Sequence, residues 1–199
     1  NLKTIMYTLI NGSPKIVNSN SENFLNKVSE KIKNFNLFYL KKDNYESILD
    51  SIYKSDTIVL AFPLYADSPT SITLEFLDYL YDNNINLNKK NCYIIINCGF
   101  REGIHNITAL NIIKRFLKKV NGIYKGSILI GAGEVVGKDK FKFCSKKALS
   151  NLDDFIKHIN NKEECKEIIT TMDYLNNKWF IKIANHNWRK TARKNHIKI

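Results

Sequence analysis

The sequence predicts a doubly wound α/β domain, in which helices cover both faces of a parallel sheet. Five short apolar runs alternate with stretches of helical periodicity along the 199 residues. The runs lack a polar residue at every second position, as is typical of strands buried on both faces. With right-handed crossovers, this alternation predicts a three-layer αβα sandwich.

The first unit combines a strand with a helix. Residues 5–10 form an apolar, partly β-branched run that predicts a buried strand. A polar loop follows, and we expect a helix to begin at Asn20 or Ser21. Within this helix Phe24, Val28 and Ile32 recur every four residues and predict its buried side.

The second and third strands are expected at residues 35–40 and 57–62, with a short helix over 45–53 between them. The third strand runs into Pro63, and proline cannot continue a central ladder. Ser68 is typical of a helix cap, with Pro69 in the first turn of a helix that buries residues 72, 76 and 80.

The fourth and fifth strands are expected at residues 92–97 and 127–130. The helix between them ends at Asn121-Gly122, where glycine suits a left-handed cap. From about Lys138 the pattern predicts helix with a polar break near residues 160–164. We therefore expect one domain over 1–199, with a five-stranded sheet in the order 2-1-3-4-5 and extra C-terminal helices.

The composition limits the class of protein. No apolar run reaches membrane-spanning length, and the first residues lack a signal-peptide pattern. The four cysteines show neither metal-ligand spacing nor a disulfide framework, so we expect a reducing cytoplasm and no metal. The net charge of +12 indicates nucleic acid, an anionic membrane or a phosphorylated ligand, or only a composition rich in Lys, Asn and Ile.

The loop after the first strand predicts an anion site. Helix N-termini present unpaired N–H groups and the positive end of a dipole, which favour phosphate. A plain strand-to-helix connector explains the same pattern, and the loop matches neither the Rossmann nor the P-loop fingerprint. The predicted phosphate ligands in this loop are Ser13, Pro14, Lys15, Ser19, Asn20 and Ser21.

Two further loops at the same edge of the sheet are expected to complete a site for a flavin mononucleotide (FMN). Leu64, Tyr65 and Ala66 are expected to line the flat ring, with backbone N–H groups left free where the strand ends at Pro63. The loop after the fourth strand is expected to close over the pyrimidine end, with Gly99 allowing a close approach. The predicted residues of these two loops are Pro63, Leu64, Tyr65, Ala66, Asp67, Asn97, Cys98, Gly99 and Phe100.

Five segments carry a resemblance to a known family. They read NGSPK with SNS in 11–21, AFPLYADSPTS in 61–71, NCGFREGIHN in 97–106, GAGE in 131–134 and IANHNWRKTARKN in 183–195. The chain resembles the flavodoxin-like NAD(P)H-dependent oxidoreductases, or NADPH-dependent FMN reductases, of clostridial type. The resemblance implies a flavodoxin-like fold, non-covalent FMN held by the first three loops, and often a homodimer.

The chain departs from the family pattern at three positions. Ser19 stands where the family loop usually has Gly, Lys15 where Arg is common, and Ala132 within what is commonly a run of three glycines. We therefore expect the backbone of the first loop to contribute more to phosphate binding than its side chains do.

These observations favour an FMN-dependent reductase that takes hydride from NADH or NADPH and passes electrons to a small acceptor such as a quinone, a nitro or azo compound, or a flavin. The alternatives are an FMN electron carrier without a pyridine-nucleotide site, and a basic binding module without flavin. Hydride transfer to a flavin needs no protein acid or base, so no catalytic side chain is predicted. Cys98 and His105 are expected to serve packing and capping.

The C-terminal part, about 165–199, is predicted to be a basic amphipathic helical extension. No acidic residue occurs from Tyr174 to Ile199. Such a helix can bind nucleic acid or a membrane surface. We instead expect it to pack on the domain or on the second subunit of a homodimer. Its predicted apolar stripe is Leu175, Trp179, Phe180, Ile183, Ala184 and Trp188.

Overall fold

The structure is a computed structural model that describes residues 7–15, 17–136, 145–172 and 177–197. Its centre is a six-stranded parallel sheet in the order β2-β1-β3-β4-β5-β6. The strands are β1 Tyr7–Asn11, β2 Phe35–Tyr39, β3 Thr57–Pro63, β4 Asn91–Asn97, β5 Ile123–Ile130 and β6 Ile168–Thr170. The predicted α/β class and the order of the first five strands are confirmed.

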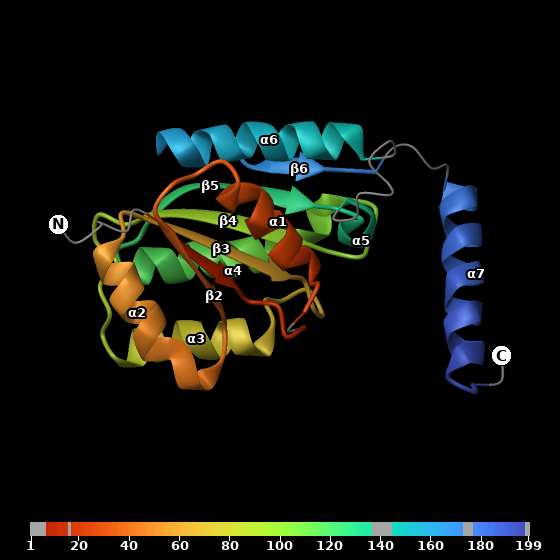
Figure 1. Ribbon diagram of the computed structural model, residues 1–199, viewed down its shortest axis with the longest axis horizontal. Helices are drawn as coiled ribbons and strands as arrows, with labels where there is room; N and C mark the ends of the chain where they lie inside the picture. Colours follow the sequence, from red (N-terminus) through yellow and green to blue (C-terminus); the bar gives the residue numbers. More distant parts are fainter. Residues whose placement is uncertain (1–6, 16, 137–144, 173–176, 198–199) are drawn as a thin grey trace.

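Helices cover the sheet on both faces (Figure 1). The helices α2 Tyr45–Lys54, α3 Ser71–Asp82 and α4 Ile107–Lys119 pack on one face. The opposite face is covered by α1 Asn20–Ser29, the short α5 Gly133–Val136 and α6 Lys146–Asn161. Two short 3-10 helices, η1 Lys42–Asn44 and η2 Gly103–Asn106, precede α2 and α4.

Each face has its own apolar core because alternate residues of the central strands point to opposite sides. In β4, Ile94 and Ile96 belong to the core under α2, α3 and α4, whereas Tyr93 and Ile95 belong to the core under α1 and α6. Tyr93 also packs edge-on against Phe155 of α6, with ring centroids 5.9 Å apart. Burial of both sets explains why the apolar runs in the sequence lack polar alternation.

The sheet has one strand more than predicted. Ile168–Thr170 pairs in parallel with Ile128–Ile130 of β5 and becomes the new edge strand. The predicted five-stranded sheet was therefore wrong in its strand number. Three consecutive β-branched residues carry this strand, but a run so short gives no periodicity that distinguishes it from a helix.

Other boundaries also differ from the sequence-based expectation, and β5 begins at Ile123 rather than at residue 127. The cap of α3 is Thr70, whose hydroxyl accepts from the Thr73 N–H, and not Ser68. Within the predicted C-terminal helical extension, β6 precedes the helix α7 Asn177–Lys194. The expected helix start near Lys138 lies outside the described residues.

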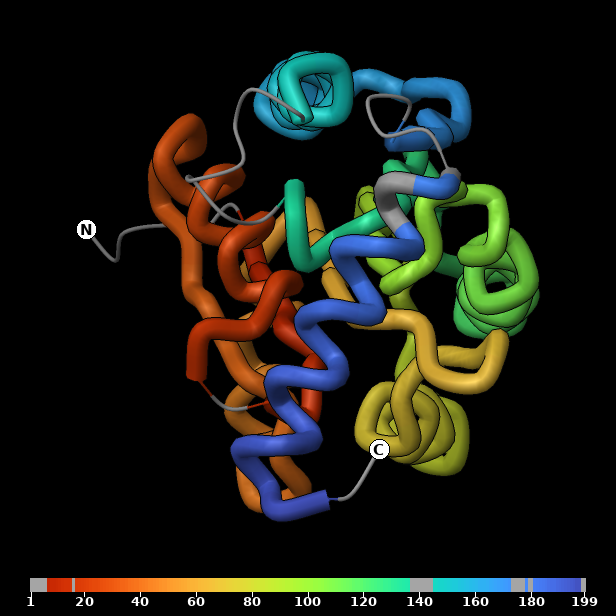
Figure 2. The backbone as a smooth tube through the Cα atoms, turned by 90° about the vertical axis from the view of Figure 1, so that its right-hand side faces the viewer, coloured from red at the N-terminus to blue at the C-terminus, as the bar shows by residue number. Residues whose placement is uncertain are grey.

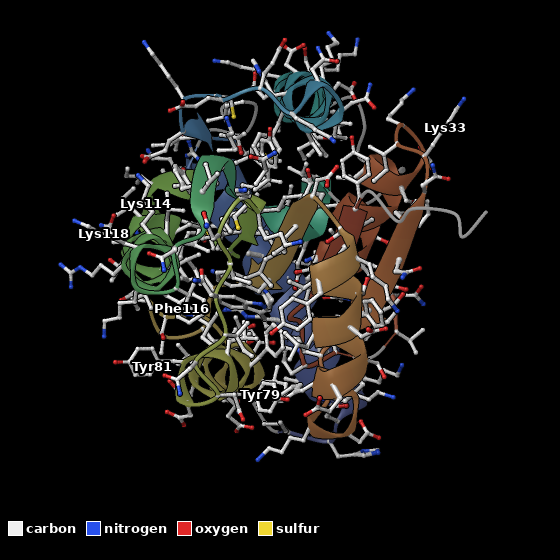
Figure 3. All side chains as sticks on the ribbon, turned by 90° about the vertical axis from the view of Figure 1, so that its left-hand side faces the viewer. Lys33, Tyr79, Tyr81, Lys114, Phe116 and Lys118 are labelled. Carbon is white, nitrogen blue, oxygen red and sulfur yellow. The ribbon has the colours of Figure 1, made fainter. Side chains whose placement is uncertain are left out.

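Much of the positive charge is spread over the body of the protein. On the side away from the carboxyl ends of the strands, Lys33, which follows α1, and Lys114 and Lys118 of α4 extend outward (Figure 3). Lys114 forms an ion pair with Glu167 and lies over the ring of Tyr124. No helix among the described residues is both long enough and apolar enough to span a membrane.

Candidate functional site at the carboxyl edge of the sheet

The carboxyl ends of β1, β3 and β4 meet at one edge of the sheet. Asn11, the last residue of β1, pairs with Ala61, and Pro63 at the end of β3 pairs with Asn97 at the end of β4. The chain reverses its winding direction between β1 and β3, and ligands of open α/β sheets bind at such a switch point. All three predicted loops therefore lie at the same edge.

The first loop is held in place by its own side chains. The amide group of Asn11 donates to Ser19 Oγ at 3.2 Å, and Asn11 Oδ1 accepts from the Ser13 N–H at 2.9 Å. Ser13 Oγ accepts from the Lys15 N–H, and Lys15 Nζ donates to the carbonyl of Asn18. The loop is thus folded around its own polar groups before any ligand binds.

The helix α1 begins at Asn20, as predicted, and Ser19 is its N-cap. Ser19 Oγ accepts from the Glu22 N–H at 3.0 Å, and Glu22 Oε2 accepts from the Ser19 N–H at 3.2 Å, which forms a capping box. Tyr39 donates to the other oxygen of Glu22 at 2.7 Å. The cap occupies the third N–H of the helix and leaves the N–H groups of Asn20 and Ser21 without an intrahelical acceptor.

The side chain of Ser19 therefore has a structural role that the sequence did not reveal. Its oxygen accepts from both Asn11 and Glu22, so the hydroxyl has only its proton to offer a ligand. This observation agrees with the expectation that backbone donors contribute most to an anion site here.

Gly12 allows the loop to pass close to α3. A Cβ atom at position 12 would lie 2.2 Å from Thr73 Oγ1 and 3.1 Å from Phe62 Cβ. The Gly12 carbonyl accepts hydrogen bonds from the hydroxyls of Thr70 and Thr73, at 2.6 and 3.3 Å. The start of the first loop is thereby joined to the N-terminus of α3.

The second loop differs from the prediction in its hydrogen bonds. We expected the N–H groups of Leu64, Tyr65 and Ala66 to be free. Instead, Leu64 N–H donates to the Asn97 carbonyl at 2.8 Å, so the ladder continues past Pro63, and Tyr65 N–H donates to the Ser68 carbonyl at 3.0 Å. Of these three groups, the Ala66 N–H remains as the candidate donor to the flat ring of a bound ligand.

The second loop is a tight turn that carries an exposed aromatic ring. Ala66 and Asp67 have φ values of 47° and 57°, and the exchange of hydrogen bonds between Tyr65 and Ser68 closes the turn around them. Tyr65 is 54% exposed. A ring held on a rigid turn can contact a flat ligand with little loss of side-chain freedom.

The third loop presents a second exposed ring beside an open space. Phe100 is 55% exposed and stacks at a tilt on His105, with ring centroids 4.4 Å apart. A Cβ atom added at Gly99 would meet no atom of the protein within 4 Å. We predicted that Gly99 lets this loop come close to a bound ring, and the space in front of Gly99 is open to a ligand.

Asn97 and Cys98 lie beneath this loop and are buried. Asn97 Nδ2 donates to Ser21 Oγ at 3.0 Å and to the Phe62 carbonyl at 3.3 Å. Burial raises the pKa of the Cys98 thiol, which lies near the carbonyls of Phe100 and Glu102. At neutral pH this thiol is protonated and is a poor nucleophile, in agreement with the packing role that we expected.

The fifteen predicted site residues all lie at this edge, in three neighbouring loops and in the strand and helix ends beside them. A cavity of about 140 Å³ lies elsewhere, between α6 and β6, and is lined by residues such as Lys147 and Thr170. This volume is below the roughly 300 Å³ at which ligand pockets begin. No cluster of three His, Cys, Asp or Glu side chains in the described part of the chain is arranged to hold a metal ion.

Solved structures share this fold at low sequence identity. An NADPH-quinone reductase from P. pentosaceus superposes with a TM-score of 0.59 at 18% identity, over 78% of this chain and 97% of that one. An NADH:FMN oxidoreductase in its apo form gives 0.60 at 17% identity, over 81% of this chain and 91% of that one.

A general stress protein 14 from Treponema denticola, solved in complex with FMN, gives a TM-score of 0.56 at 13% identity, over 75% of this chain and 98% of that one. No protein-family model matches the sequence, and a comparison with curated proteins also finds no match. The resemblance to flavodoxin-like NAD(P)H-dependent FMN reductases is therefore supported at the level of the fold.

Replacing Ser19 by Ala tests its structural role. We expect the free energy of unfolding to fall by about 1 kcal/mol, because the helix loses its cap and Asn11 loses an acceptor. Chemical denaturation measures this change. Asn26→Ala, on the exposed side of the same helix, is the control. Equal stabilities of the two variants would contradict the assignment of Ser19 as the cap.

Replacing Gly99 by Val tests the open space in front of the third loop. We expect unchanged stability, because the new side chain meets no protein atom, together with weaker FMN binding, because it occupies the space for the ring. Thermal melting and fluorescence titration with FMN measure the two effects. The distant Cys165→Ser is the control, and wild-type FMN affinity in the valine variant would remove this loop from the site.

Proposed function

We propose that the protein is an FMN-dependent oxidoreductase that takes hydride from NADH or NADPH. The observation that carries this proposal is the placement of the Asn20 and Ser21 N–H groups at the same edge as two exposed rings, Tyr65 and Phe100. An anion site beside a pair of aromatic side chains fits a molecule that has a phosphate at one end and a flat ring at the other.

Different residues of the edge would bind different parts of FMN. The N–H groups of Asn20 and Ser21, helped by the Ser13 hydroxyl, would hold the phosphate. Tyr65 and Phe100 would flank the ring, and the Ala66 N–H would donate to its polar rim. Lys15 Nζ, which bonds to the Asn18 carbonyl, would place a positive charge near the phosphate.

Bound FMN would supply the redox chemistry, by accepting hydride and passing electrons on. The protein would orient the ring, exclude water from one side of it, and aim backbone donors at its polar edge. The Cys98 thiol, protonated and turned toward backbone carbonyls, would support the loop without entering the reaction. The exposure of both rings leaves room beside the flavin for a nicotinamide and then for a small acceptor, such as a quinone, a nitro or azo compound, or a second flavin.

The fold neighbours support this proposal through their names, which include NADPH-quinone reductase and NADH:FMN oxidoreductase. A second candidate, an FMN electron carrier, is supported by a flavodoxin from Streptococcus pneumoniae that matches with a TM-score of 0.56 at 12% identity, over 79% of this chain and 99% of that one. The net charge of +12 favours the reductase, because flavodoxin carriers are typically acidic.

Replacing Asn20 and Ser21 together by Ala tests the phosphate site. We expect FMN binding to weaken by about 1–3 kcal/mol, because the Ser21 hydroxyl no longer fixes the Asn97 amide and polar donors near the phosphate are lost. Fluorescence titration measures the affinity. Ser29→Ala, at the other end of the same helix, should bind FMN like the wild type, and wild-type affinity in the double variant would show that these two side chains do not help to hold the phosphate.

Rapid mixing of the FMN-loaded protein with NADH or NADPH separates the two candidate functions. In a reductase, the nicotinamide should reduce the bound FMN, so that its yellow absorbance is lost after mixing. The absorbance should return when a quinone is added and reoxidises the flavin. A carrier would bind FMN but stay yellow with either nicotinamide. A protein that binds no FMN would instead support the basic binding module without flavin.

A further inference from the structure

The C-terminal helix α7 stands outside the three layers of the fold. Figures 1 and 2 show it on the side of the molecule where the carboxyl ends of the strands lie, and it crosses that side in Figure 2. The side chains that the structure describes in this helix are exposed, apart from the half-buried Ala184 and Ala192. The predicted packing of this helix on its own domain is therefore absent among the described residues.

One face of α7 is apolar and open to water. Ile181, Ala184, Trp188 and Ala192 follow one another at spacings of three and four residues, which places them on one side of the helix. These four residues form the apolar stripe of α7. Ile181 is 56% exposed and Trp188 is 71% exposed, so the largest side chains of the stripe have no cover.

This stripe differs in part from the one expected from the sequence. Ala184 and Trp188 belong to both. Ile183 lies on another face, because two residues turn a helix by more than half a circle from Ile181. Leu175 and the side chains of Trp179 and Phe180 lie outside the described residues.

Basic residues lie on both sides of the apolar stripe. Four of them are spaced by four and seven residues and form a row along one side: Lys178, Lys182, Arg189 and Arg193. Lys190 and Lys194 lie on the other side, on the face that carries Ile183. No acidic residue occurs anywhere from Tyr174 to Ile199, so the helix has six positive charges and no negative charge.

A comparison with α4 shows what is unusual in α7. The helix α4 also has four basic residues and no acidic one, but its apolar residues Leu110, Ile113 and Leu117 are buried in the core. Positive charge alone is common in this chain of net charge +12 and indicates no partner. What distinguishes α7 is a cationic helix whose apolar face is left in water, and a surface that covers this face would be stabilising.

An anionic lipid surface fits this pattern better than a nucleic acid or a protein groove. A bilayer accepts apolar side chains below its headgroups, while long basic side chains beside them reach the phosphates. A nucleic acid would bind the basic residues but leave the stripe in water. Protein grooves hold a helix through large anchors at successive positions, whereas Ala184 and Ala192 make this stripe shallow.

The segment before α7 is fastened to the third loop of the candidate site. The Met172 N–H donates to the Arg101 carbonyl, and Arg101 Nε donates to the Met172 carbonyl, both at 3.1 Å. The helix begins at Asn177, and five residues of fully extended chain span at most about 18 Å. A surface that holds α7 therefore lies near the carboxyl edge of the sheet.

We propose that α7 lies on an anionic membrane surface, with its apolar stripe at the boundary between headgroups and acyl chains and its basic residues on the headgroup phosphates. Trp188 enters this boundary, where tryptophan is favoured because its ring is apolar and its N–H can donate to water or to a headgroup. The helix lies in the plane of the surface, since none of the described helices can span a bilayer. This inference goes beyond the proposed function and does not depend on FMN.

Two matched variants test the apolar stripe. Ile181→Glu and Ile183→Glu remove the same side chain and add the same negative charge, but only Ile181 belongs to the stripe. Both side chains are exposed, at 56% and 47%, so both variants should fold like the wild type. Sedimentation with vesicles of phosphatidylcholine and phosphatidylglycerol in equal parts measures binding to lipid.

We expect Ile181→Glu to bind these vesicles at least about tenfold more weakly than Ile183→Glu, because burial of an isoleucine is lost and a charge would enter the boundary. Ile183→Glu should bind slightly more weakly than the wild type, because it only lowers the positive charge. A wild type that does not bind, or two variants that bind equally, would overturn the proposal.

Tryptophan fluorescence tests whether α7 is the segment that binds. Both tryptophans of the chain, Trp179 and Trp188, belong to α7, so their emission reports on this helix alone. We expect the emission to shift to shorter wavelength with the anionic vesicles and less with phosphatidylcholine alone, and added salt should weaken the shift. An unshifted emission from vesicle-bound protein would show that another part of the chain binds lipid, which would overturn the assignment to α7.

Two further measurements identify a different occupant of the helix. Salt-sensitive binding to duplex DNA that Ile181→Glu leaves unchanged, without binding to vesicles, would overturn the proposal in favour of a nucleic acid. Light scattering that finds a dimer for the wild type and a monomer for Ile181→Glu, again without binding to vesicles, would assign the stripe to a second copy of the chain.

The same assays separate this inference from the proposed function when the full chain is used with and without FMN. A protein that binds anionic vesicles through α7 but binds no FMN would contradict the proposed function and support the membrane-surface helix. A protein that binds FMN but no vesicles would do the reverse.

Discussion

The buried side-chain amide of Asn97 holds the functional edge of the sheet together. It donates to Ser21 in the first turn of α1 and to the Phe62 carbonyl in β3, while the backbone carbonyl of Asn97 accepts from Leu64. Gly133 lies so close that a Cβ atom there would be 2.8 Å from Asn97 Oδ1. The N-terminus of α1, the turn that carries Tyr65 and the loop that carries Phe100 are thereby fixed relative to one another, as the proposed binding of a phosphate and a ring requires.

Most of the fold could be predicted because burial on both faces leaves a strong signal in the sequence. The apolar runs of the strands and the start of α1 at Asn20 matched the structure, whereas the left-handed residue after α4 is Asn121 and not the predicted Gly122. The grouping of the three loops also followed, because parallel strands bring their carboxyl ends to one edge. Local chemistry and topology were sufficient for these features.

The remaining features depend on contacts between distant parts of the chain. The strand β6 exists because three residues find the free edge of β5, and Leu64 N–H is occupied because Asn97 lies beside it. The role of Ser19 as an acceptor for Asn11 and Glu22 likewise follows from the folded loop. The stripe of α7 was assigned partly to the wrong residues, since Ile181 and not Ile183 shares the face of Trp188.

The central claim is that the edge binds a flavin through its phosphate, and the affinities of FMN and riboflavin test it most directly. The two ligands share the ring and differ in the phosphate that α1 would hold. Two charge-assisted hydrogen bonds of about 1.5–3 kcal/mol each predict that FMN binds at least about 100-fold more tightly than riboflavin. Equal affinity for both ligands, measured by fluorescence titration of the full chain, would contradict the claim.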